Sequence, residues 1–133
     1  MSTSDQIARL PFADTLGITV EEWTSKQVVA AMAWAEHLCT AGGILHGGAL
    51  MAFADTVGAL CAVANLPEGA GTSTIESKTN FFRAVRGGVV TATCQPLHVG
   101  RSTIVVQTDL KDDRGKRVAQ VTQTQAVLGG QGT

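Results

Sequence analysis

The run His46-Gly-Gly-Ala-Leu-Met-Ala-Phe-Ala-Asp-Thr-Val-Gly-Ala-Leu-Cys-Ala-Val-Ala-Asn65 decides the fold of this chain of 133 residues. It is too long for a buried strand, and its alanine and leucine content favours a helix. After His46, its one charged residue is Asp55. A helix that is apolar on nearly every face is normally covered by other structure, so we expect the rest of the chain to wrap around it.

Two features of this predicted helix suggest chemistry. A carboxylate among apolar neighbours is costly unless it is hydrogen-bonded or used, and we expect the neighbours of Asp55 to desolvate it. Gly47 and Gly48 leave backbone N–H groups bare at the positive end of the helix dipole, where a ligand oxygen could be held. Two plainer readings stay open: the Gly-Gly pair forms only a tight turn, and Asp55 only hydrogen-bonds to a neighbouring loop.

The composition limits the possible partners. The length suits one domain over residues 1–133, and a formal charge of −1 without a basic stripe argues against nucleic acid. The one apolar run of membrane length carries Asp55 at its middle, and no signal pattern precedes it, so we expect a cytoplasmic protein with no membrane partner. The 3 cysteines show no C-x-x-C spacing, which is typical of free thiols in a reducing compartment.

The rest of the chain reads mainly as strands. Expected strands span residues 16–23, 27–34, 72–82, 89–99, 102–110 and 116–128, while 1–11 and 129–133 are expected to be flexible. Asp112 to Gly115 predicts a hairpin turn, and Pro96, near the end of its expected strand, predicts an edge or a bulge there. The last strand carries glutamine and threonine on both faces, so one face is expected to meet water or another chain. We therefore predict an α+β fold, a predominantly antiparallel sheet around one long helix, whose open edges favour pairing with a second copy.

Four motifs together resemble a known family. They are Gly43-x-x-His46-Gly47-Gly48, Asp55-Thr56, Asn80-Phe81-Phe82-Arg83 and Gly87-Gly88. They resemble the hotdog-fold acyl-CoA thioesterases of the phenylacetate-pathway and 4-hydroxybenzoyl-CoA types, over about residues 12–127. The resemblance implies a hotdog fold, a homodimer that often pairs into a tetramer, and hydrolysis of an aryl- or medium-chain acyl-CoA to free acid and CoA without a cofactor.

The resemblance also assigns catalytic roles. It implies that Asp55 is the catalytic carboxylate and that the Gly47 N–H polarises the thioester carbonyl. Thr40 stands where many relatives carry Asn or Gln, so it keeps a hydroxyl but loses an NH2 donor pair. His46 is expected to hold the loop before the helix, with contact to the thioester as the alternative. The expected substrate-binding residues are Gly48, Met51, Thr56, Phe82, Arg83, Arg101 and Ser102.

Other candidate groups are weighed against plainer roles. His37, Cys39 and His46 fit no closed four-ligand pattern, so we expect no metal site. Cys61 lacks the basic neighbour that a nucleophilic thiol needs. Lys78 and Lys116 could meet CoA phosphates, as Arg83 and Arg101 could, or simply be solvated. Two other functions remain open: a hotdog hydratase or dehydratase, and a non-catalytic acyl-CoA-binding module.

Spacing along the helix predicts that one chain does not complete the site. Asp55 follows Gly47 by eight residues, which is about 12 Å along a helix axis. A donor about 3 Å from the carbonyl oxygen and a base about as close to the carbon can be only some 6–7 Å apart. Two antiparallel helices across a two-fold axis would bring Gly47 of one chain to Asp55 of the other. The acyl pocket is expected to be apolar, with Met51, Phe53 or the strand phenylalanines at its edge.

Overall fold

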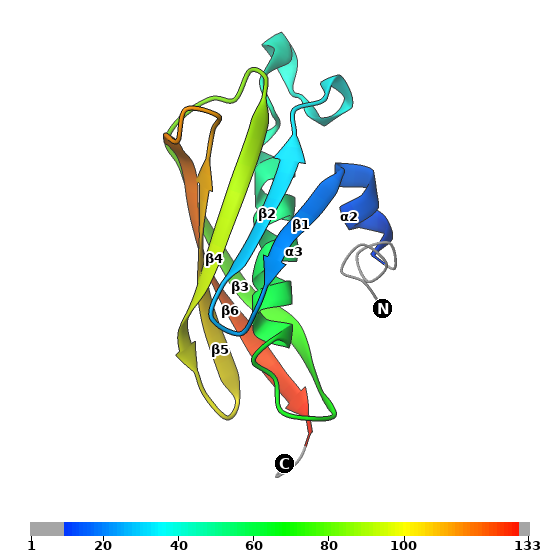
Figure 1. Ribbon diagram of the computed structural model, residues 1–133, viewed down its shortest axis with the longest axis vertical. Coiled ribbons are helices and arrows are strands. Elements are labelled where there is room, and N and C mark those ends of the chain that lie inside the picture. Colours follow the sequence, from blue (N-terminus) through cyan, green and yellow to red (C-terminus); the bar gives the residue numbers. More distant parts are fainter. Residues whose placement is uncertain (1–9, 131–133) are drawn as a thin grey trace.

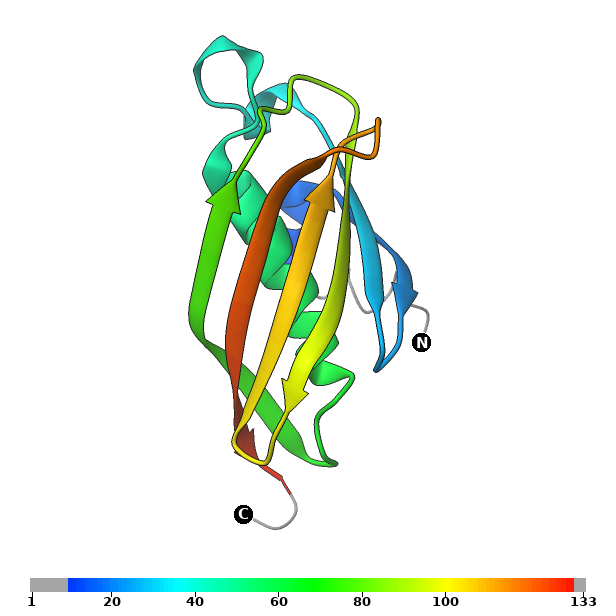
Figure 2. The same ribbon diagram turned by 90° about the vertical axis from the view of Figure 1, so that its left-hand side faces the viewer.

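The long helix α3 spans Gly47–Val63 and lies against one face of a six-stranded sheet (Figures 1 and 2). The arrangement is that of a computed structural model, which describes residues 10–130. The flexibility expected for residues 1–9 and 131–133 lies outside the described residues. Residues 129 and 130 are described, and Gly129 ends the last strand.

The sheet is antiparallel throughout. Its strands are β1 (Ile18–Trp23), β2 (Val28–Ala33), β3 (Ala70–Phe81), β4 (Val89–Val99), β5 (Thr103–Lys111) and β6 (Arg117–Gly129). They lie in the order β1-β2-β4-β5-β6-β3, so that β1 and β3 are the edges. Two short 3-10 helices, η1 (Glu36–Leu38) and η2 (Ala41–Gly43), precede α3. The predicted α+β architecture is therefore confirmed.

A short helix, α2 (Pro11–Leu16), replaces the end of the expected flexible lead-in. Pro11 occupies its first turn, where a missing N–H costs nothing. Gly17 ends it in the left-handed conformation, with φ 74°, which glycine adopts without strain. Ala13 and Leu16 are buried against the rest of the molecule. Pro11, which was expected to be flexible, is therefore helical, and the helix extends to Leu16, where a strand was expected to begin.

The core lies between α3 and the inner face of the sheet. On the helix, Phe53 and Val57 are fully buried. Along β5 the burial alternates with a period of two, and Ile104, Val106 and Leu110 point inward. Burying such a side chain contributes about 1.5–3 kcal/mol. Phe53 is therefore core and does not edge a pocket.

One side of α3 is not covered by the chain. Met51 is 40% exposed and Val63 is 44% exposed, and Asp55 on the same side is also exposed. The expectation that the helix is wrapped on nearly every face was therefore wrong for the single chain. Small residues such as Ala52 and Ala59 make the open side look like core in the sequence. Within residues 10–130, no helix is long and apolar enough to cross a membrane.

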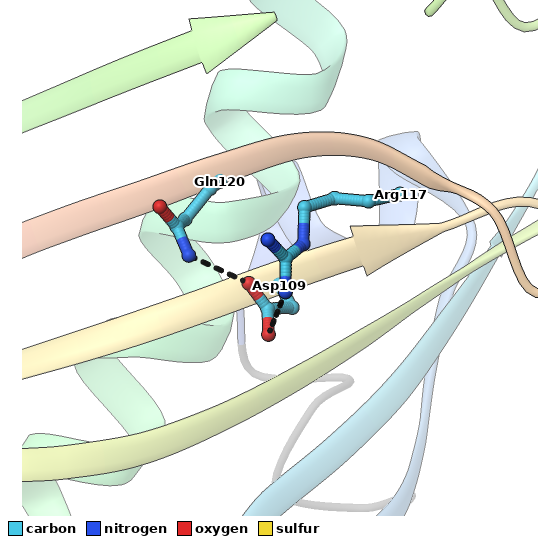
Figure 3. A network of polar contacts seen from close by, with 3 residues as sticks. All are labelled: Asp109, Arg117 and Gln120. Atoms are coloured by element: carbon cyan, nitrogen blue, oxygen red, sulfur yellow. Dashed lines mark hydrogen bonds and ion pairs between the residues drawn. The ribbon is translucent and has the colours of Figure 1, made fainter. Parts of the chain in front are cut away.

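The last strand, β6, alternates between buried and partly exposed residues from Ala119 to Ala126. Gln123 and Gln125 point inward and are fully buried, whereas Gln120 points to the outer face. On that outer face, the Gln120 side-chain NH2 donates to Asp109 at 3.2 Å, and Arg117 pairs with the same carboxylate at 3.4 Å (Figure 3). The expected open face is therefore the outer one, which is partly exposed, whereas Gln123 and Gln125 belong to the buried face.

Two local predictions are confirmed by the backbone. The hairpin turn between β5 and β6 is held by Asp112, whose carboxylate accepts hydrogen bonds from the N–H groups of Arg114 and Lys116. Pro96 lies at an irregularity in the pairing of β4 with β5, where a strand tolerates a residue without an N–H.

Candidate active site

The start of α3 leaves one backbone N–H group available. His46 is the N-cap, and its Nδ1 accepts a hydrogen bond from the Gly48 N–H at 2.7 Å. The ring therefore holds the turn, as in the loop role favoured from the sequence, and occupies the Gly48 donor. Among residues 10–130, no acceptor is bonded to the Gly47 N–H, which lies at the positive end of the helix dipole. Gly47 is the donor that a ligand oxygen can use.

Asp55 lies on the uncovered side of α3, two turns further on. Its Oδ1 accepts two hydrogen bonds, from the Thr74 hydroxyl at 3.1 Å and from the Gln123 side-chain NH2 at 2.5 Å. Within the described part of the chain, Oδ2 has no hydrogen-bond partner. The carboxylate is thus held by one oxygen and free at the other. Its side chain is exposed in the single chain, so the desolvation expected from its apolar neighbours is not supplied by this chain alone.

An apolar hollow of about 400 Å³ opens beside Asp55. Thr74 and Thr56 accompany the carboxylate in its wall, and the remaining lining is apolar. Much of that apolar lining comes from the α2 segment, including Phe12, and from the later turns of α3, including Ala59. The sequence reading missed this contribution of α2. Thr56 donates its hydroxyl to the Ala52 carbonyl at 3.0 Å, so its own polar group is satisfied by the helix.

A different hollow contains Gly47. It also has a volume of about 400 Å³, and Thr40, Phe82 and Arg83 line it. The Phe81 ring lies over Gly47, because a Cβ atom on this glycine would be 3.2 Å from the ring carbon Cζ. Phe81 and Phe82 are 49% and 56% exposed. The structure thus brings four predicted site residues together around this hollow, but not Asp55. They are Thr40, Gly47, Phe82 and Arg83.

A basic hollow shares part of its wall with the Gly47 hollow. The segment from Arg83 to Val85 lines both hollows, and the basic hollow has a volume of about 360 Å³. Its charged lining residues are Arg83, Arg86, Arg114, Lys116, Asp112 and Asp113. Both carboxylates accept hydrogen bonds from backbone N–H groups. The backbone N–H of Lys116 is the main cause that lowers the pKa of Asp112 below its usual range. Among residues 10–130, Arg117 and Asp109 form the one ion pair, so the cations of this hollow are not paired with carboxylates.

The remaining predicted residues lie elsewhere. Arg101 lines a hollow of about 370 Å³ beside Asn65 and Pro67, at the opposite end of α3 from Gly47. Ser102 follows it in the turn between β4 and β5 and accepts a backbone hydrogen bond from Val127. Met51 is exposed and lines none of these hollows.

Two of the three cysteines are buried together. Cys61 and Cys94 are fully buried against each other. A hydrogen bond with the Cys61 thiol, together with burial, raises the pKa of Cys94. Within residues 10–130, no group of three or more His, Cys, Asp or Glu side chains is arranged to hold a metal ion.

Comparison of the sequence and the fold with known proteins places this chain in a family. A family model described as the thioesterase superfamily matches residues 42–119. A Vibrio cholerae protein provisionally named an esterase is 37% identical over 112 residues, which are 84% of this chain and 75% of that protein. The proofreading thioesterase EntH of Cronobacter sakazakii is 34% identical over 65% of this chain and 64% of its own. The crystal structure of a thioesterase from Haemophilus influenzae has a TM-score of 0.89 at 28% identity, covering 97% of this chain and 92% of that chain.

Proposed function

Because this chain belongs to the thioesterase superfamily and has its hotdog fold, and is therefore a thioester hydrolase, we propose that its substrate is an acyl-CoA. Asp55 acts on the thioester carbonyl, and the Gly47 N–H polarises the carbonyl oxygen. Two observations carry this proposal: a free carboxylate oxygen beside an apolar hollow, and a free N–H in a second hollow that shares a wall with a basic one.

The apolar hollow suits the acyl group. Its wall is apolar apart from Asp55, Thr56 and Thr74, which lie together at the carboxylate. An acyl chain with its carbonyl at Asp55 would therefore bury its methylenes against the α2 segment and the last turns of α3. The lining offers no polar group, beyond those beside the carboxylate, that could recognise a ring hydroxyl. We expect aryl and medium-chain acyl groups to be accepted without a strict choice among them.

The basic hollow suits the CoA portion. Arg83, Arg86, Arg114 and Lys116 line a space that shares part of its wall with the hollow of Gly47. Guanidinium groups recognise phosphate oxygens through paired hydrogen bonds, and none of these cations is neutralised by an ion pair in the described residues. A CoA thioester with its carbonyl at Gly47 could place its phosphates there.

The complete site is proposed to need a second copy of the chain. Gly47 and Asp55 are eight residues apart on one helix, about 12 Å along its axis, and they line different hollows. The uncovered side of α3 carries Met51 and Val63, and the neighbouring edge strand β3 exposes Ile75 by 62%. Exposed apolar groups beside an unpaired strand edge are typical of an interface. Antiparallel pairing across a two-fold axis would give two equal sites, each with Asp55 from one copy and Gly47 from the other.

The chemistry follows from these positions. Asp55 Oδ2 attacks the carbonyl carbon or takes a proton from the water that does so, and negative charge develops on the carbonyl oxygen near the Gly47 N–H. A C–O bond forms, the C–S bond breaks, and the departing CoA sulfur takes a proton. The overall change consumes one water and gives the free acid and CoA.

The test is thiol release from a panel of acetyl-, hexanoyl-, benzoyl- and phenylacetyl-CoA. We expect turnover of several members, and a loss of roughly 10² or more in kcat for Asp55→Asn, which preserves shape and removes the base. Asp109→Asn is the matched control, since this carboxylate also accepts from a glutamine but lies on the outer face of the sheet. Normal turnover by a folded Asp55→Asn protein would contradict the role of Asp55. Equal kcat/KM for CoA and N-acetylcysteamine thioesters would contradict the role of the basic hollow.

A further inference from the structure

A buried glutamine beneath α3, Gln123, holds the carboxylate of Asp55 through its side-chain amide. Gln123 is fully buried on the inner face of β6, between the apolar Val121 and a second buried glutamine, Gln125. Burying an amide costs a few kcal/mol unless its groups are hydrogen-bonded. Its NH2 group donates to Asp55 Oδ1 and, at 3.2 Å, to the Thr74 hydroxyl. Its Oε1 has no hydrogen-bond donor among the described residues.

The orientation of this amide is fixed by chemistry. An ionised carboxylate only accepts hydrogen bonds, so the NH2 group of Gln123 must face Asp55. The carbonyl oxygen must then face α3, where it lies against Gly58. A Cβ atom at position 58 would be 2.1 Å from Gln123 Oε1, closer than any real contact. Glycine at this position therefore makes the space that lets the buried amide reach the carboxylate.

A second chain of hydrogen bonds reaches the same oxygen from β3. Gln125 donates to the Thr74 hydroxyl at 2.8 Å, which leaves the proton of that hydroxyl for Asp55 Oδ1 at 3.1 Å. The Thr72 hydroxyl, with one proton to donate, lies 3.0 Å from Gln125 Oε1 and 2.8 Å from the Ala126 carbonyl oxygen. The pairing of β3 with β6 is irregular just after Thr74, and such bulges commonly re-aim a side chain. Every observed bond to Asp55 thus goes to Oδ1, and Oδ2 stays free.

We infer that Gln123 is a positioning residue for the hydrolysis, and that Gly58 is the space it requires. The buried amide fixes Oδ1, so that Oδ2 is held toward the thioester carbonyl rather than rotating in solvent. The inference rests on the proposed role of Asp55 and adds to it the residue that orients the carboxylate. Misplacement of a reacting group by about 1 Å can cost about 10²-fold in rate.

The main test is Gln123→Met, which keeps the length of the side chain and removes its polar atoms. Replacing a buried amide that has an orphan carbonyl by an apolar group of similar shape is nearly neutral for folding, and Asp55 remains solvated. We expect kcat to fall by roughly 10- to 100-fold, with KM changed less than threefold and the melting temperature within a few degrees. Gln120→Met is the matched control, because Gln120 lies on the same strand and its amide also donates to an aspartate, but on the outer face of the sheet. It should keep its kcat.

A second variant perturbs the amide without changing it. Gly58→Ala places a methyl group where Gln123 Oε1 now lies, while alanine favours a helix by about 1 kcal/mol over glycine. We expect kcat to fall without loss of helix stability. The double variant Gly58→Ala/Gln123→Met should have a kcat no lower than that of the less active single variant. In an Asp55→Asn background, Gln123→Met should change the residual rate less than twofold.

These outcomes separate the two levels of the account. If Asp55→Asn is inactive while Gln123→Met and Gly58→Ala keep kcat within twofold, the positioning role is wrong and the proposed function stands. If Asp55→Asn keeps its activity, the proposed role of Asp55 fails, and the positioning role of Gln123 fails with it. If Gln123→Met loses activity only in proportion to lost folded protein, or Gln120→Met loses as much kcat, Gln123 is merely structural.

Discussion

If the apolar hollow beside Asp55 holds the acyl group, enlarging Ala59 should have an effect of predictable size. This residue lies one helical turn after Asp55 and lines the same hollow of about 400 Å³. Ala59→Leu adds three carbon atoms to the wall, and leucine is a good helix former, so the helix should be retained. The added atoms take space that acyl methylenes would otherwise fill.

The expected magnitude follows from burial. Each methylene moved from water into an apolar site contributes about 0.8 kcal/mol, so losing room for three of them costs about 2.4 kcal/mol. That cost corresponds to roughly a 60-fold loss in kcat/KM for chains long enough to reach position 59. Acetyl-CoA, which does not reach it, should lose less than threefold.

The assay is thiol release with straight-chain acyl-CoAs from acetyl to decanoyl, for the unmodified protein and for Ala59→Leu. For the unmodified protein, kcat/KM should rise about fourfold per methylene until the hollow is full. In the variant the rise should stop at shorter chains. A loss of equal size for acetyl- and decanoyl-CoA, or no loss at any length, would refute the placement of the acyl group.

Three further predictions concern folding and accessibility. His46→Ala should lower the free energy of unfolding by about 1 kcal/mol through loss of the N-cap, and His46→Asn should restore it, as chemical denaturation can show. Because backbone hydrogen bonds lower the pKa of Asp112 in the folded state, they stabilise the fold above the unfolded pKa, and this stabilisation is lost as the pH falls through the folded pKa. Asp112→Asn should therefore lower the melting temperature at pH 7 and have little effect near pH 2; a difference that does not shrink with acid would contradict this. In the native protein a thiol reagent should label Cys39, which is partly exposed, and reach Cys61 and Cys94 only after unfolding, as peptide mass mapping can check.

The sheet could be predicted from sequence because its signals are local. Strand bounds followed from β-branched runs punctuated by Gly, Asp and Pro, and the turn at Asp112 and the irregularity at Pro96 lie where expected. The helix α2 had local signals too, Pro11 at its start and Gly17 after its end, but a helix of six residues is too short to show a period.

The surroundings of Asp55 could not be predicted in the same way. Alanine is common in cores and at close helix contacts, so a stripe containing Ala52 and Ala59 looks buried until the fold shows which side the sheet covers. The surroundings of Gln123 are a second example, because alternation along its strand places this residue on the inner face. An inward glutamine makes sense only once tertiary structure brings Asp55 above it and Gly58 leaves it room.

Subunit mixing tests the proposed two-chain site most directly. One chain carries Asp55→Asn, and the other carries Gly47→Pro, which deletes the N–H donor. Proline is tolerated at the first position of a helix, and a residue that precedes proline must be extended, as His46 already is with ψ 135°. Each homodimer should be inactive, and differently tagged heterodimers should have one working site, so that an equal mixture regains about a quarter of full activity. Verified heterodimers that stay inactive, or an active monomer, would contradict a site built from Asp55 of one copy and Gly47 of the other.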